Sequence, residues 1–231
     1  MRPGERPEIA SLPLFREMQE SQRERIFSGS FLQAFPAQLT LFELGQHPDF
    51  LHVLVDGLVE LFTHSAGRDT TMRIVEPVTS FILAAVVTDQ PYLMSARTIA
   101  PSRILLVPAA LVRELVKDDP ALMQATMREL AHAYRDMVRA LTDMKLRQSA
   151  ERLGNLILQQ ERRQGGNGKV QLKAEKRLIA SLLGMTPEIL SRAFGVLGGH
   201  GIAVSAAQIT ITDRAALTAF SRPDPVPDDQ S

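Results

Sequence analysis

Residues 176–200 constrain the fold most, because their pattern fits two short helices joined by a tight turn. Gly184 can adopt the left-handed backbone conformation that ends a helix. Thr186 is a favourable N-cap, and Pro187 suits the first helical position, where its missing N–H costs nothing. Apolar residues recur at helical spacing on both sides of the turn: Leu178, Ile179, Leu182 and Leu183 before it, and Ile189, Leu190, Ala193, Phe194 and Leu197 after it. The pattern predicts a helix-turn-helix, whose second helix can lie in a major groove.

The polar face of the predicted second helix carries Glu188, Ser191 and Arg192. Arginine can form a two-pronged contact with guanine, glutamate can accept from the amino group of cytosine, and serine can do either. An ordinary helical hairpin with a solvated polar face would show the same residue types. We expect these three side chains to contact bases, and a second set to contact the DNA backbone: Lys176, Arg177, Thr186 and His200.

The run GMTPEILSR, residues 184–192, resembles the recognition segment of the family of the cyclic-AMP receptor protein and the fumarate-nitrate regulator (CRP/FNR). The trio Glu188, Ser191 and Arg192 is similar to that of the FNR type, which recognises TTGAT-like half-sites. The resemblance extends more weakly over nearly the whole chain. It implies an α+β fold with an N-terminal double-stranded β-roll of the cyclic nucleotide-binding type, a long dimerisation helix and a C-terminal winged helix-turn-helix.

This interpretation divides the chain into four segments. We expect residues 1–117 to form the β-roll effector domain, and residues 118–147 to form the dimerisation helix and hinge. Residues 148–221 would form the winged helix-turn-helix. Residues 222–231 are rich in Pro and Asp and have too little apolar content to pack, which predicts a disordered tail.

Short apolar segments separated by turn residues predict β-strands between residues 31 and 108. The clearest stretch, LHVLVDGLVELFTH, has an apolar run on each side of Asp56-Gly57, a dipeptide typical of a β-hairpin. Residues 70–75 and 103–107 are further strand candidates. This spacing of short strands favours a β-sandwich or a β-barrel.

The resemblance also indicates where an effector would bind. In many members of the family a glutamate holds the ribose of a cyclic nucleotide and an arginine pairs with its phosphate; Ala84 and Leu93 take these places here. A buried phosphodiester without a cation would be poorly compensated, so we expect an effector other than cyclic AMP. Control by a cyclic nucleotide remains the alternative, because Arg97 lies nearby and its strand register decides whether it points inward. The predicted pocket is lined by Leu83, Ala84, Leu93, Met94, Arg97, Leu130, Tyr134 and Met137.

Residues 81–108 resemble the nitric-oxide-responsive DNR and NnrR branches of the family. Some of those proteins use haem, so nitric oxide acting through haem is one hypothesis for the effector. We predict no metal site, because no two of the five histidines have metal-binding spacing: His47, His52, His64, His132 and His200. The chain has no cysteine, which excludes a cysteine-ligated iron–sulfur cluster.

Residues 120–144 show the longest helical pattern in the chain. Apolar or small residues recur at alternating steps of four and three: Thr126, Leu130, Ala133, Met137, Ala140 and Met144. This heptad spacing is typical of a two-stranded coiled coil. A core helix packed against its own domain is the alternative. A palindromic DNA site needs a twofold axis, which favours a homodimer.

Charge is unevenly distributed, although the formal net charge is zero. Residues 145–214 hold 11 basic and 5 acidic side chains, net +6, whereas residues 1–144 hold 14 and 18, net −4. A basic segment around a helix-turn-helix is expected of a module that binds phosphates. The charge pattern therefore supports double-stranded DNA as a partner. The family resemblance implies RNA polymerase as a further partner.

Other classes of protein find less support. No apolar run is long enough to cross a bilayer, and the first ten residues lack the apolar core of a signal peptide, so we expect a cytoplasmic protein without membrane contact. No nucleophile–base pair, paired carboxylates or phosphate loop indicates an enzyme. A regulator that binds a protein partner and has lost DNA binding is a further alternative, and the intact Glu188, Ser191 and Arg192 argue against it.

Overall fold

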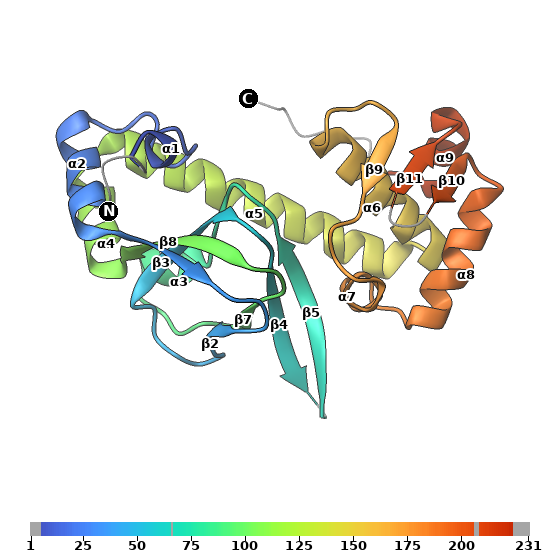
Figure 1. Ribbon diagram of the computed structural model, residues 1–231, viewed down its shortest axis with the longest axis horizontal. Helices are drawn as coiled ribbons and strands as arrows, with labels where there is room; N and C mark the ends of the chain where they lie inside the picture. Colours follow the sequence, from blue (N-terminus) through green and yellow to red (C-terminus); the bar gives the residue numbers. More distant parts are fainter. Residues whose placement is uncertain (1–5, 66, 206–207, 224–231) are drawn as a thin grey trace. The chain divides into compact units, whose positions relative to one another are not determined.

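The structure is a computed structural model that describes residues 6–65, 67–205 and 208–223. The chain divides into two compact units, Met1–Arg135 and Asp136–Ser231, and the division falls inside the long helix α5 (Pro120–Leu146) (Figure 1). This helix confirms the helical pattern predicted for residues 120–144. Most of the predicted tail, from residue 224 onward, lies outside the described residues.

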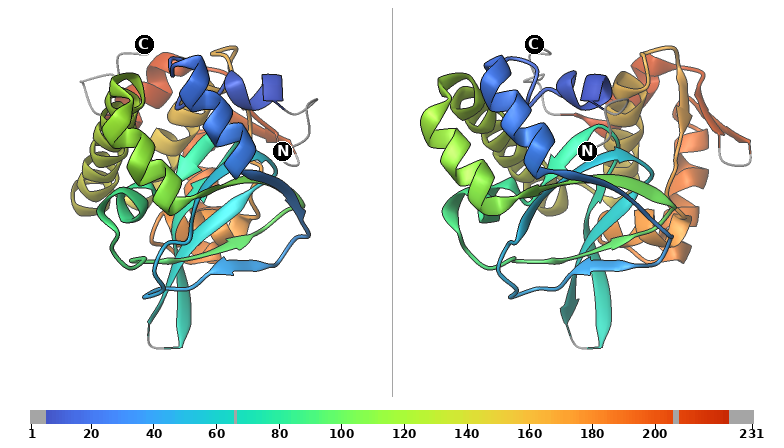
Figure 2. Two further views of the ribbon diagram at one scale, coloured as in Figure 1. Left: turned by 90° about the vertical axis from the view of Figure 1, so that its left-hand side faces the viewer. Right: turned by 60° about the vertical axis from the view of Figure 1, so that its left-hand side comes forward.

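Unit 1 is built on two four-stranded antiparallel sheets, with strand orders β1-β8-β3-β6 and β2-β7-β4-β5. This arrangement confirms the predicted β-roll and its strand candidates (Figure 2). The strands are β1 (Phe31–Phe35), β2 (Thr40–Phe42), β3 (Phe50–Asp56), β4 (Val59–Ser65), β5 (Arg68–Val75), β6 (Thr79–Phe81), β7 (Ser95–Thr98) and β8 (Ser102–Pro108).

The hairpin predicted at Asp56-Gly57 was wrong. β3 pairs with β6 and β8, whereas β4 pairs with β5 and β7, so this turn carries the chain from one sheet to the other. Gly57 has a φ of 99°, and a side chain there would collide with the main chain at Pro101 and Ser102. The Asp-Gly pair therefore makes a tight turn against β8, and the local pattern does not specify which strands pair.

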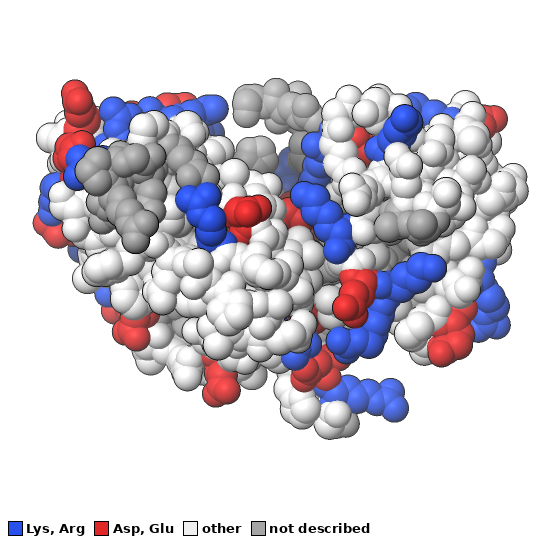
Figure 3. All heavy atoms as spheres, viewed as in Figure 1, with Lys and Arg blue, Asp and Glu red and all other residues white. Residues whose placement is uncertain are grey.

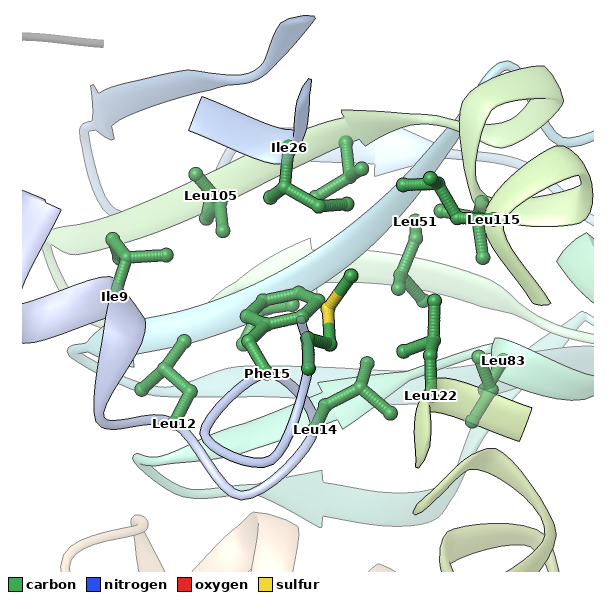
Figure 4. Close-up of a cluster of buried hydrophobic side chains, with 14 of the residues drawn as sticks. Ile9, Leu12, Leu14, Phe15, Ile26, Leu51, Leu83, Leu105, Leu115 and Leu122 are labelled. Carbon is green, nitrogen blue, oxygen red and sulfur yellow. The ribbon is translucent and has the colours of Figure 1, made fainter. Parts of the chain in front are cut away.

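Alternation along β3 fills two separate cores. Leu51 and Val53 belong to a core that is covered by α1 (Arg6–Ala10), α2 (Glu20–Gly29), α4 (Ala109–Asp118) and the start of α5 (Figure 4). Leu54 belongs to a second core, which residues of both sheets build between them. The short helix α3 (Leu83–Thr88) contributes Leu83 and Val86 to the first core.

Unit 2 confirms the predicted winged helix-turn-helix. Its elements are α6 (Ser149–Arg163), β9 (Lys169–Gln171), α7 (Lys176–Leu182), α8 (Pro187–Gly198), β10 (Ile202–Ser205), β11 (Gln208–Ile211) and α9 (Arg214–Ser221). The strands form one antiparallel sheet in the order β10-β11-β9. Residues 206–207, predicted to lie between the two wing strands, are outside the described residues. Leu153, Ile157 and Leu197 lie in the core that α6 and α8 share. Across the described ranges of both units, no helix has the length and apolar content needed to cross a membrane.

Candidate DNA interface and effector region

The turn between α7 and α8 forms as predicted from local sequence. Gly184 has a φ of 61°, the left-handed conformation expected at the end of a helix. The Thr186 hydroxyl accepts a hydrogen bond from the Ile189 N–H at 3.4 Å, and Pro187 occupies the first turn. These features fix where α8 begins, and hence which of its residues face outward.

The three predicted base-contacting residues lie together on the exposed face of α8. Glu188, Ser191 and Arg192 are all exposed. The opposite face packs into the core of unit 2 through Leu190, Ala193 and Leu197. A hydrogen bond with Thr186 and the nearby charge of Arg192 lower the pKa of Glu188, so its carboxylate is charged at neutral pH. The exposed face of α8 therefore offers the carboxylate of Glu188 as an acceptor, the guanidinium of Arg192 as a cation and the hydroxyl of Ser191.

The four residues predicted to contact the DNA backbone differ in how exposed and how free their side chains are. Lys176 and Arg177 are exposed at the start of α7, with the ammonium of Lys176 5.9 Å from the centre of the Phe194 ring. Thr186 already uses its hydroxyl oxygen as a helix cap. The His200 ring stacks on Phe220 at a centroid distance of 4.0 Å and is only partly exposed. Lys and Arg side chains are more prominent than Asp and Glu on the part of Figure 3 that unit 2 presents.

Local sequence patterns did not reveal how the helix-turn-helix is held to the end of α5. Arg152 on α6 donates from Nε to the carbonyl of Leu183 and from Nη1 to the carbonyl of Arg147. Asn155 donates to Asp143 of α5 at 3.0 Å. A methyl group added at Gly184 would collide with the side chain of Met144. The turn before α8 is thus in direct contact with the last turn of α5.

The structure does not bring the predicted effector-pocket residues together. Leu83 is buried in the first core of unit 1, whereas Met94 packs against the second. Leu93 is 81% exposed and Ala84 is also exposed. On α5, Leu130 packs partly against the first core, while Tyr134 and Met137 are exposed.

Arg97 is already held by two carboxylates. Its Nε donates to Glu60 at 2.7 Å and its Nη1 to Asp69 at 2.8 Å, and its guanidinium lies 4.2 Å from the centre of the Phe62 ring. Glu60 is 1% exposed and also accepts from Thr71 at 2.6 Å. A hydrogen bond from His64 and the contact with Arg97 lower the pKa of Asp69. Two of the five N–H donors of Arg97 are thus engaged, and two carboxylates already balance its charge.

The histidines occupy unrelated environments. His47 and His132 are exposed, and His64 bonds to Asp69 at 2.9 Å. His52 is buried between the two sheets against Phe42 and Phe81. Within the described ranges, no three His, Asp or Glu side chains are placed to hold a metal ion.

Along α5 an exposed apolar row follows the heptad spacing. Its members are Met123, Met127, Leu130, Tyr134, Met137, Leu141 and Met144, and all except Leu130 are at least 43% exposed. The row shares Leu130, Met137 and Met144 with the predicted seam. Thr126 is 3% exposed, so it packs in its own unit and has little surface to offer a partner. The steps of four and three fit this neighbouring row as well as the predicted seam.

Two family models match the chain, one in each unit. Residues 32–119 match the cyclic nucleotide-binding domain, and residues 151–220 match the Crp-like helix-turn-helix domain. Together they cover more than half of the chain. No curated protein sequence matched it.

Several solved structures are similar over most of their length. A regulatory protein from Silicibacter pomeroyi DSS-3, described as a candidate cAMP-binding protein, is 25% identical, with a TM-score of 0.61 over 95% of this chain and 99% of that one. FixK2 from Bradyrhizobium japonicum is 19% identical, with a TM-score of 0.75 over 86% and 99%. DNR from Pseudomonas aeruginosa is 21% identical, with a TM-score of 0.51 over 95% and 99%. The likenesses to FixK2 and DNR show the fold alone.

A β-roll and a winged helix-turn-helix occur here in one chain, in this order, and each matches the corresponding domain model. The chain belongs to the CRP/FNR family of transcription regulators, with an N-terminal effector-binding domain and a C-terminal DNA-binding domain.

Proposed function

We propose that this regulator binds a palindromic TTGAT-N4-ATCAA-type DNA site as a homodimer, under the control of an effector other than cyclic AMP. The observation that carries the proposal is the joint exposure of Glu188, Ser191 and Arg192 on one face of α8. A glutamate, a serine and an arginine on one helical face provide the hydrogen-bonding groups that distinguish G·C from A·T pairs in a major groove.

The apolar row on α5 supports the homodimer. Six large apolar side chains stand exposed there at heptad spacing. Pairing the row with the same row of a second copy would remove this surface from water and relate the two recognition helices by a twofold axis. Such symmetry is what a palindromic site requires.

Two observations support an effector other than cyclic AMP. Ala84 and Leu93 offer no ligand for a ribose or a phosphate, and Met94, which directly precedes β7, is also apolar. Arg97 is neutralised by Glu60 and Asp69. The match to the cyclic nucleotide-binding domain keeps a cyclic nucleotide as the alternative effector.

The mechanism we propose is a shift between two placements of the DNA-binding domains. Ser80 of β6 donates a hydrogen bond to Glu129 of α5, which links the β-roll to this helix. At the other end of α5, Met144 contacts Gly184 in the helix-turn-helix. An effector that binds the β-roll better in one state would favour the matching placement of α8.

A gel-shift assay tests the DNA proposal, with the TTGAT-N4-ATCAA duplex and a duplex of the same composition and scrambled half-sites. Specific binding should be at least about a thousandfold tighter than binding to the scrambled duplex. Equal affinity for both duplexes would favour the alternative of a protein-binding regulator that has lost DNA binding.

The remaining partners follow from this role. A DNA-bound regulator acts where the chromosome lies, so we place the protein in the cytoplasm with RNA polymerase as its partner. Transcription in vitro with purified polymerase, with and without this protein, tests the proposed action on RNA polymerase. An unchanged transcript level from a promoter that carries the site would contradict it.

A further inference from the structure

We propose that Gly195 is a contact residue of the DNA interface, where the bare main chain of α8 comes too close to DNA to leave room for a side chain. This inference rests on the proposed DNA binding by α8. Glu188, Ser191 and Arg192 would contact DNA through their side chains, whereas Gly195 would contribute because it has none.

Gly195 lies at the centre of the exposed face of α8. An α-helix turns by about 100° per residue, so Gly195 points between Ser191, four residues before it, and Arg192, three residues before it. It lies within about 20° of the direction of Glu188, two turns away. Leu190, Ala193 and Leu197 occupy the opposite, buried side. A ligand that touches both Ser191 and Arg192 in successive turns therefore passes over Gly195.

The fold itself gives no reason for glycine at this position. The φ of Gly195 is outside the left-handed region, and a methyl group added there would have open space around it among the described residues, apart from the backbone of α8 itself. Gly184 differs, because its φ is 61° and a side chain would collide with Met144. A glycine in the middle of a helix costs about 0.5–1 kcal/mol relative to alanine. The free protein would thus be more stable with alanine at position 195.

A close approach of α8 to DNA would explain why position 195 is a glycine. A helix with its side chains is about 10–12 Å across, and the major groove is about 12 Å wide, so a helix lying in it has little spare room. Glycine is the residue that lets a backbone approach a ligand most closely. Without a side chain at Gly195, the helix can sit deep enough for Ser191 and Arg192 to contact bases.

The test compares Gly195→Ala and Gly195→Gln with the control Gly198→Ala. Gly198 is also exposed, but it is the last residue of α8, nearly two turns beyond Ser191 and about 60° around the helix from Gly195. DNA affinity is measured by fluorescence anisotropy on the sequence that wild type selects from a random pool, so the result does not depend on the TTGAT prediction. Thermal unfolding of each free protein is measured alongside.

We expect Gly195→Ala to unfold at the same or a higher temperature than wild type, yet to bind the selected DNA about tenfold more weakly, because an added methyl group overfills a close contact. Gly195→Gln should bind more weakly still, and Gly198→Ala should bind like wild type. A loss on selected and random DNA alike would place the contact at phosphates, and a loss on the selected sequence alone would place it at base edges; either result supports the proposal.

A Gly195→Ala protein that binds the selected DNA as tightly as wild type would overturn the inference. A wild-type protein that selects no sequence from the pool would instead overturn the proposed DNA binding, and this inference with it. The two failures are distinguished by whether the wild-type protein enriches a sequence.

Discussion

Arg152 on α6 binds the carbonyl of Leu183, at the end of α7, through an Nε–O hydrogen bond of 3.0 Å. Its Nη1 donates at 2.8 Å to the carbonyl of Arg147, in the connection that follows α5. Both carbonyls lie at helix ends, where intrahelical partners are lacking. One guanidinium therefore joins the helix-turn-helix to the end of α5.

Replacing Arg152 should loosen this connection. Arg152→Met keeps much of the side-chain length but removes both hydrogen bonds, which should lower the free energy of unfolding of unit 2 by about 1–3 kcal/mol. Chemical denaturation measures the change. Arg162→Met, which alters an exposed arginine of the same helix, serves as the control. Equal stability of Arg152→Met and wild type would show that these bonds contribute nothing.

Met137, in the middle of the exposed row on α5, tests the dimer. Met137→Asp would place two like charges face to face in an apolar contact, where an unpaired buried charge is heavily penalised. We expect a monomer in analytical ultracentrifugation, with the circular dichroism of the β-roll unchanged.

The matched control for this variant is Met72→Asp, which changes a methionine of β5 that is 52% exposed and is not part of the apolar row on α5. It should remain dimeric. If Met137→Asp also sediments as a dimer, the seam on α5 is misplaced.

The helix-turn-helix could be predicted because its signals are local. Gly184, Thr186 and Pro187 mark the turn within four residues, and the structure has both helices where these residues place them. The hairpin prediction at Asp56-Gly57 failed because a turn signal does not say which strands pair. The pairing of β3 with β8 and of β4 with β7 depends on contacts between residues that are 33 to 58 positions apart in the sequence.

The effector region was hard to predict for the same reason. The partner of Arg97 is Glu60, 37 residues earlier, and nothing near Arg97 in the sequence indicates that carboxylate. Leu83 and Met94 are separated because they pack into different cores, a distinction set by sheet stacking rather than by local pattern. Two neighbouring rows on α5 satisfy the heptad spacing, and the spacing alone does not choose between them.

The buried histidine makes stability depend on pH. Burial lowers the pKa of His52 from 6.5 to about 4. Between these two values the unfolded chain binds a proton that the folded chain does not, so the free energy of unfolding should fall as the pH drops from about 6.5 to about 4, by on the order of 2–3 kcal/mol.

Urea denaturation across this pH range measures the effect. His52→Phe, which keeps an aromatic ring beside Phe42 and Phe81, should show a shallower decline than wild type. Identical pH profiles for the two proteins would mean that His52 does not account for the loss.

Cyclic AMP should not bind at physiological levels. Its phosphate would meet Arg97 only where Glu60 and Asp69 already balance the guanidinium charge, so its desolvation would be poorly compensated. Isothermal titration calorimetry should show no saturable heat at millimolar cyclic AMP, and DNA affinity should not respond to it. Saturable binding at micromolar concentration would restore the cyclic nucleotide as the effector.

The most direct test of base contact by α8 is a missing-contact experiment with Arg192→Ala. Wild type and variant are titrated onto the TTGAT-N4-ATCAA duplex and onto duplexes in which the G·C pair of each half-site is replaced by A·T. If Arg192 contacts that guanine, the variant should lose about 1–3 kcal/mol of binding free energy on the intact site and should no longer distinguish the substituted sites from it. An equal loss on every duplex would make Arg192 a phosphate contact and contradict the proposed base recognition.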